Sequence, residues 1–190
     1  VLMSLFTSDR ERRLWFAVVA VVAAIYSTLG LASVLAPSLY NQGVSAIGFL
    51  GCMLLVALAV AIQGLNIKPG GIELGVIVAI AVVYLLVLLR LTLPERSHLI
   101  EYGALAILIH EALSERKKQG RCVPWPRLLA VLAAALVGVA DETLQLVVPR
   151  RKFQWSDMLF NFLAAAMAVL AVVILAWARR MTIQKLQKDG

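Results

Sequence analysis

The chain has 190 residues, of which 62% are hydrophobic and 15% are charged, and its mean hydropathy is +0.89. Soluble domains are typically about half apolar and about a quarter charged. This composition therefore excludes a single soluble domain and predicts an all-α, polytopic membrane protein. The net charge of +7 does not indicate a nucleic-acid partner, because the basic residues lie between apolar segments, where they set topology and meet anionic headgroups.

Six apolar segments follow one another along the chain, each near the roughly 20 residues that a helix needs to cross a bilayer. They are predicted at residues 14–36, 44–64, 72–93, 98–113, 127–148 and 157–177. Pro37, Pro94 and Pro149 stand at the ends of the first, third and fifth segments, as expected of a residue that breaks helices. We expect one integral membrane domain over residues 1–190, a bundle of about six transmembrane helices.

The connections between these segments predict the orientation. With the N-terminus inside, thirteen Lys and Arg residues fall on the cytoplasmic side, whereas five (Arg90, Arg96, Arg150, Arg151 and Lys152) fall on the other side. This excess predicts that both termini are cytoplasmic. The longest connection, 114–126, is predicted to be a solvated basic turn, and a basic tail follows residue 177. No cleavable signal peptide is expected, because the first apolar segment is long and lacks a small-x-small cleavage site.

The sequence offers little to a metal ion or a cofactor. Cys52 and Cys122 stand apart, which disfavours a disulfide framework or a cysteine metal site. His110-Glu111 resembles the start of a zinc-binding HExxH motif, but Ser114 occupies the place of the second histidine. There is no GxSxG motif and no glycine-rich phosphate loop. We therefore expect neither a metal site nor a cofactor.

Unusual polar residues gather in three stretches that the topology places on the extracytoplasmic side. In the fourth segment, His98, Glu101 and Tyr102 are spaced i, i+3 and i+4, so they share one helix face. In the fifth segment Asp141 and Gln145 are four residues apart, and in the sixth Asp157 and Asn161 are four residues apart. The three stretches are His98, Glu101 and Tyr102; Asp141, Glu142 and Gln145; and Asp157 and Asn161. The third stretch also includes Arg150-Arg151-Lys152, which precede Asp157.

Two adjacent acids in a membrane helix are costly, at about 2.5–3.5 kcal/mol for each centrally placed charge. Arg150 or Arg151 is the expected counter-ion, and Asn161 and Tyr102 are expected to supply hydrogen bonds, which together predict a compact polar cluster beneath the outer headgroups. Two interpretations fit such a cluster: it locks three helices together, or it is a functional site. For His98 alone, simple solvation is the favoured explanation, and for Asp157 a helix-capping role is at least as strong an explanation as a ligand contact.

These stretches resemble the VanZ-like family. Asp141-Glu142-x-x-Gln145, Pro149-x-Arg151 and Asp157-x-x-x-Asn161 are similar to its main motif, and His98-x-x-Glu101-Tyr102-Gly103 to its other recurring element. The resemblance covers about residues 90–176. The chain departs from the family pattern at Arg150, where a small or polar residue often stands, and at Ala164 and Ala168, where glycines often follow the asparagine.

The family takes its name from a protein associated with resistance to the glycopeptide teicoplanin, so the resemblance implies work at a bacterial cell envelope, in the cytoplasmic (inner) membrane. Our leading hypothesis is a protein that binds a lipid headgroup or an envelope intermediate, with membrane lipids as its partners. The predicted ligand-binding residues are His98, Glu101, Tyr102, Asp141, Glu142, Gln145, Arg151, Asp157 and Asn161.

Two alternatives stay open. The chain is an accessory or structural subunit of a larger membrane complex, with other membrane proteins as partners. Or it is an enzyme acting on a lipid-linked substrate, with Asp141 or Glu142 as general base, His98 as proton partner and Arg151 as an electrophilic clamp. A non-catalytic role is favoured over the enzyme, because no nucleophile or metal set is recognisable in the sequence.

Overall fold

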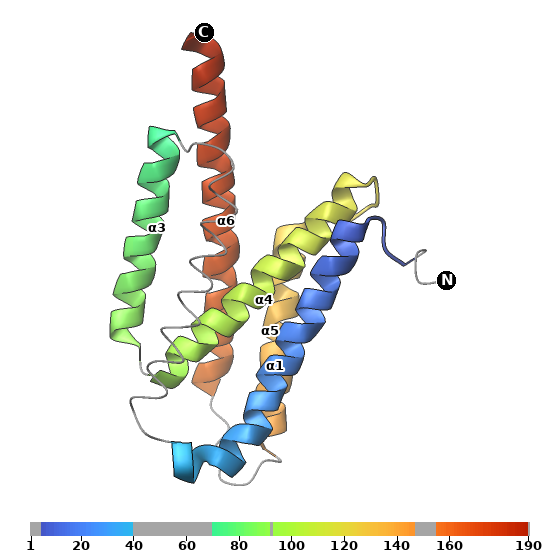
Figure 1. Ribbon diagram of the computed structural model, residues 1–190, viewed down its shortest axis with the longest axis vertical. Coiled ribbons are helices and arrows are strands. Elements are labelled where there is room, and N and C mark those ends of the chain that lie inside the picture. The colour runs from blue at the N-terminus through green and yellow to red at the C-terminus, as the bar shows by residue number, and fades with distance from the viewer. Residues whose placement is uncertain (1–4, 40–69, 92, 147–154, 190) are drawn as a thin grey trace. The chain divides into compact units, whose positions relative to one another are not determined.

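The computed structural model describes residues 5–39, 70–91, 93–146 and 155–189. These ranges form five helices and contain no strand: α1 (Asp9–Leu39), α3 (Gly71–Arg90), α4 (Leu93–Lys118), α5 (Pro126–Gln145) and α6 (Trp155–Asp189) (Figure 1). The predicted all-α class is confirmed. The second predicted segment, 44–64, lies outside the described residues. Pro94 follows the first residue of α4, where a missing backbone N–H is tolerated.

The predicted connection at 114–126 is wrong over its first five residues, which are the last turns of α4. The helix ends instead in a Schellman motif: Gly120 has a φ of 83°, its N–H donates to the carbonyl of Lys117, and the N–H of Arg121 donates to that of Arg116. The three basic residues of the last turn, Arg116, Lys117 and Lys118, thus lie where the helix dipole favours cations.

The predicted end of the last helix near residue 177 is also wrong. The basic tail continues α6 as helix to Asp189, and no proline or glycine interrupts it before Gly190. Arg179 Nε lies 3.7 Å from Glu73 Oε1 on α3, which gives one of the tail's basic residues a partner.

The chain divides into two compact units. The first contains α1 as far as Pro37, α4 from Pro94, α5 and the start of α6 as far as Val169. The second contains α3 and the rest of α6, joined by the ion pair between Glu73 and Arg179. All of the site residues discussed below belong to the first unit.

Small side chains form much of the core of the first unit. Because small residues let helix backbones approach closely, they suit packing in lipid, where burying apolar surface between helices gives little drive. At Gly103 on α4, an added Cβ would lie 3.5 Å from the Cβ of Ala168 on α6. The buried alanines are Ala106, Ala112, Ala130, Ala134, Ala164, Ala165 and Ala168.

Three of the described helices are long and apolar enough to cross a membrane: α3, α5 and α6 over Trp155–Lys185. Only 11% of the α3 span is buried, and large apolar side chains such as Leu86 and Leu89 are exposed along it. Continuous exposed apolar surface of this kind marks contact with lipid or protein, and together with the spans it indicates a membrane protein. The total of six helices and the orientation of the termini stay predictions.

Candidate functional site

Three helices of the first unit bring the predicted polar residues together. We call these eight residues the polar cluster: His98, Glu101 and Tyr102 on α4, Asp141, Glu142 and Gln145 on α5, and Asp157 and Asn161 on α6. Asp157 is the third residue of α6 and lies in its first turn, where the helix dipole favours a carboxylate.

Glycine at position 138 sets how closely α5 and α6 approach. A Cβ added at Gly138 would lie 2.8 Å from both Cβ and Nδ2 of Asn161, so the asparagine packs directly on the α5 backbone. Glu142 is one helical turn after Gly138, and Asp157 is one turn before Asn161. In an antiparallel pair this register places Glu142 opposite Asp157, and the two carboxylates do lie within 4.8 Å of each other.

Asp141 and Glu142 face different neighbours within the cluster. Asp141 interacts with Tyr102, and also with Glu101. Gln145 Nε2 donates to Glu142 Oε1 at 2.8 Å. His98 completes the arrangement, because its ring stacks on that of Tyr102 with centroids 5.8 Å apart and an angle of 7°.

Tyr26 on α1 is a member of this neighbourhood that the sequence analysis missed. Its hydroxyl donates to the carbonyl of Val137 at 3.3 Å, and its side chain interacts with Asp141. A phenol in the middle of an apolar segment is the only signal that could have pointed to it, and that signal does not say which helix the phenol meets.

Burial divides the polar cluster into a core and a rim. Glu142, Asn161 and Tyr102 are fully buried, and Asp141 and Gln145 nearly so. The rim residues His98, Glu101 and Asp157 are half-buried. Within the described residues, neither Oδ1 nor Nδ2 of Asn161 has a hydrogen-bond partner, and the same is true of the buried Nδ1 of His98. Since buried polar atoms are nearly always paired, these atoms have unused capacity.

The predicted counter-ions of the cluster, Arg150 and Arg151, lie with Lys152 outside the described residues. The roles predicted for them therefore stay predictions. Arg96, two residues before His98 on α4, is half-buried and has an interaction partner of its own.

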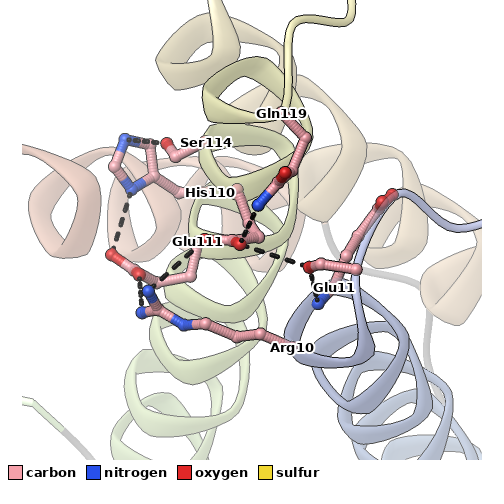
Figure 2. A network of polar contacts seen from close by, with 8 residues as sticks. Arg10, Glu11, His110, Glu111, Ser114 and Gln119 are labelled. Carbon is pink, nitrogen blue, oxygen red and sulfur yellow. Dashed lines mark hydrogen bonds and ion pairs between the residues drawn. The ribbon is translucent and has the colours of Figure 1, made fainter.

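A second polar assembly joins the start of α1 to the end of α4 (Figure 2). It therefore lies toward the other end of α4 from His98 and Glu101 of the polar cluster. We call it the α1–α4 network. Arg10 bridges Glu111 at 3.0 Å and Glu115 at 3.4 Å, and Arg116 Nε lies 2.8 Å from Glu11 Oε1. A solvated turn was predicted from residue 114 onward, so the contacts of Glu115 and Arg116 with α1 were not predicted.

Glu11 is the buried centre of the α1–α4 network. Ser8 caps α1 by accepting the N–H of Glu11 at 3.0 Å, while the Glu11 carboxylate accepts bonds from Thr7 and from Trp15 Nε1. Burial acts to raise the pKa of Glu11, but the bonds from Thr7, the charge of Arg116 and the bond from Trp15 outweigh it and lower that pKa below its usual value. This acid is accordingly held in its ionised form.

His110 and the two cysteines do not belong to the polar cluster. His110 is buried, with Nε2 3.4 Å from Ser114 Oγ, so this helix turn belongs to the α1–α4 network (Figure 2). Cys122 is exposed as a free thiol, and Cys52 lies outside the described residues.

The first unit thus turns apolar side chains such as Leu132 and Leu136 of α5 outward and buries acids on the opposite face of the same helix. Exposed apolar side chains together with buried acids are typical of a helical membrane protein with an internal polar site, and this is the class of protein to which the chain belongs. Residues 86–176 match the VanZ/LLP1 family model, and all eight residues of the polar cluster fall within that match. This region of the chain is VanZ-like, as its motifs predicted. No curated protein and no solved structure matches it.

Proposed function

We propose that this VanZ-like chain is a multi-pass protein of the bacterial cytoplasmic membrane that binds a lipid headgroup or an envelope intermediate at the polar cluster. The observation that supports the proposal is the fully buried amide of Asn161, which has no hydrogen-bond partner among the described residues. A cluster that served only to lock three helices together would be expected to use this capacity internally. A bound molecule would use it instead.

The rim of the polar cluster suits a polar ligand that enters from the headgroup region. His98, Glu101 and Asp157 are partly accessible and border the buried acids. The carboxylates favour a cationic group, whereas Arg151, which the sequence places between α5 and α6, suits a phosphate. A headgroup that carries a positive and a negative charge, or a phosphate accompanied by a cation, would suit both the carboxylates and Arg151.

Native mass spectrometry of the protein, extracted gently from its own membranes, tests this proposal. We expect the unaltered protein to retain a defined lipid or envelope precursor, and Arg151→Ala and Glu142→Gln to lose it. Arg127→Ala is the matched control, because Arg127 is an exposed residue at the start of α5, at the other end of that helix. An unchanged lipid complement in folded Arg151→Ala and Glu142→Gln would contradict the proposal.

A further inference from the structure

Three side chains of the polar cluster converge from three different helices. One ligand atom from each of His98, Glu142 and Asp157 lies within 4.8 Å of the other two. The close approach of α5 and α6 at Gly138 brings the two carboxylates opposite each other, and the first turns of α4 add the imidazole. We propose that these three residues bind a divalent transition-metal ion, a site that goes beyond the proposed headgroup binding and does not depend on it.

The donor set selects the class of ion. One imidazole nitrogen and two carboxylate oxygens suit Zn²⁺ or Mn²⁺, whereas Mg²⁺ and Ca²⁺ prefer oxygen alone. Three protein ligands leave a coordination position open for water or a substrate oxygen, as in catalytic zinc sites. Ligands about 2.1 Å from a tetrahedral ion lie roughly 3.4 Å apart, so the triad closes onto an ion with side-chain movements of about an ångström.

Neighbouring groups hold the three ligands in place. Gln145 Nε2 donates to Glu142 Oε1 at 2.8 Å, and Ser156 Oγ donates to Asp157 Oδ1 at 3.1 Å. The parallel ring of Tyr102 fixes the plane of the His98 imidazole. Such outer contacts orient metal ligands and strengthen their binding.

Electrostatics also favours a cation at this point. Glu142 is fully buried and lies within 4.8 Å of a second carboxylate, that of Asp157, so a cation placed between them would be attracted by both in a weakly screened site. A divalent ion would neutralise both. Coordination through Nδ1 of His98 would in addition use a buried atom that has no hydrogen-bond partner in the described residues.

Metal content of the full-length protein tests the proposal. The protein, purified in detergent with a histidine-free tag, is stripped with a chelator, dialysed against Zn²⁺ or Mn²⁺ and analysed by inductively coupled plasma mass spectrometry, with affinities from titration calorimetry. We expect about one ion per chain, with Mg²⁺ and Ca²⁺ unable to compete. His98→Ala and Glu142→Gln should lower the affinity by more than the roughly 10–100-fold typical of lost outer contacts.

His110→Ala is the matched control, because His110 is the chain's other histidine, also has an acid beside it, and belongs to the opposite end of α4. It should bind metal as the unaltered protein does. A second readout is thermal: Zn²⁺ should raise the Tm of the unaltered and His110→Ala proteins but not of His98→Ala. A folded, unaltered protein that takes up no Zn²⁺ or Mn²⁺, or binds Mg²⁺ equally well, would overturn the proposal, as would equal binding in His98→Ala.

Discussion

Glu11 and Glu142 are both fully buried acids, and their surroundings differ in kind. Glu11 is matched by Arg116 and by donors on its own helix, so its charge is balanced within the protein. Glu142 has a hydrogen bond from Gln145 and lies next to another carboxylate. Since an isolated buried charge is costly, the pair of Glu11 and Arg116 is complete as a structural device, whereas Glu142 belongs to the site proposed above to bind a ligand.

Arg116→Ala tests the structural role of Glu11. Removing the guanidinium leaves a buried carboxylate without its countercharge, and we expect the protein to lose about 2 kcal/mol of stability. The measurement is thermal unfolding in detergent, followed by circular dichroism. Arg10→Ala is the control: its side chain is 53% exposed, so the loss should stay below about 1 kcal/mol. Equal losses in the two variants would contradict the role assigned to the pair of Glu11 and Arg116.

At the scale of elements, α5 determines the site. Its buried stripe begins with small apolar residues, Ala130 and Ala134, passes through Gly138 and ends in acids and an amide. The small residues let α6 approach, and that approach places Asn161 and Asp157 against the polar end of the stripe. The packing of the apolar half of the helix therefore sets the geometry of the polar half.

Gly138→Ala should disturb this geometry, because its new Cβ would lie 2.8 Å from Asn161 Cβ. We expect a loss of about 1–3 kcal/mol from overpacking, partly offset by the roughly 1 kcal/mol by which alanine favours a helix over glycine. Gly103→Ala is the control, since its Cβ meets Ala168 at an ordinary 3.5 Å, and it should be neutral or slightly stabilising. Thermal unfolding of both variants makes the comparison; a Gly138→Ala protein as stable as Gly103→Ala would refute the close packing.

At the scale of the whole molecule, the two polar assemblies lie at opposite ends of the first unit, separated by most of the length of α4. If this unit spans the membrane as the charge distribution predicts, the α1–α4 network lies at the cytoplasmic face and the polar cluster at the outer face. Ion pairs rich in Arg suit the first position, and a ligand from the envelope would reach the second.

Cysteine labelling checks this orientation. In a Cys52→Ser background, the exposed thiol of Cys122 should resist a membrane-impermeant maleimide in intact cells and react after permeabilisation. With Cys122 also replaced by serine, Lys152→Cys should react in intact cells. The reverse pattern would show that the predicted orientation is wrong, and would move the polar cluster to the cytoplasmic face.

The sequence by itself determined the helical class, the membrane environment, the family and the residues of the polar cluster, because hydropathy, period and motif spacing are local properties. It did not determine where α4 ends, how far α6 continues, the contact of Tyr26 with the polar cluster or the α1–α4 network. Those depend on contacts between distant segments, such as Glu11 with Arg116. The proximity of His98, Glu142 and Asp157 also depends on such contacts, because three helices supply one residue each. The packing of α5 on α6 at Gly138 and Asn161 helps to bring the three side chains together.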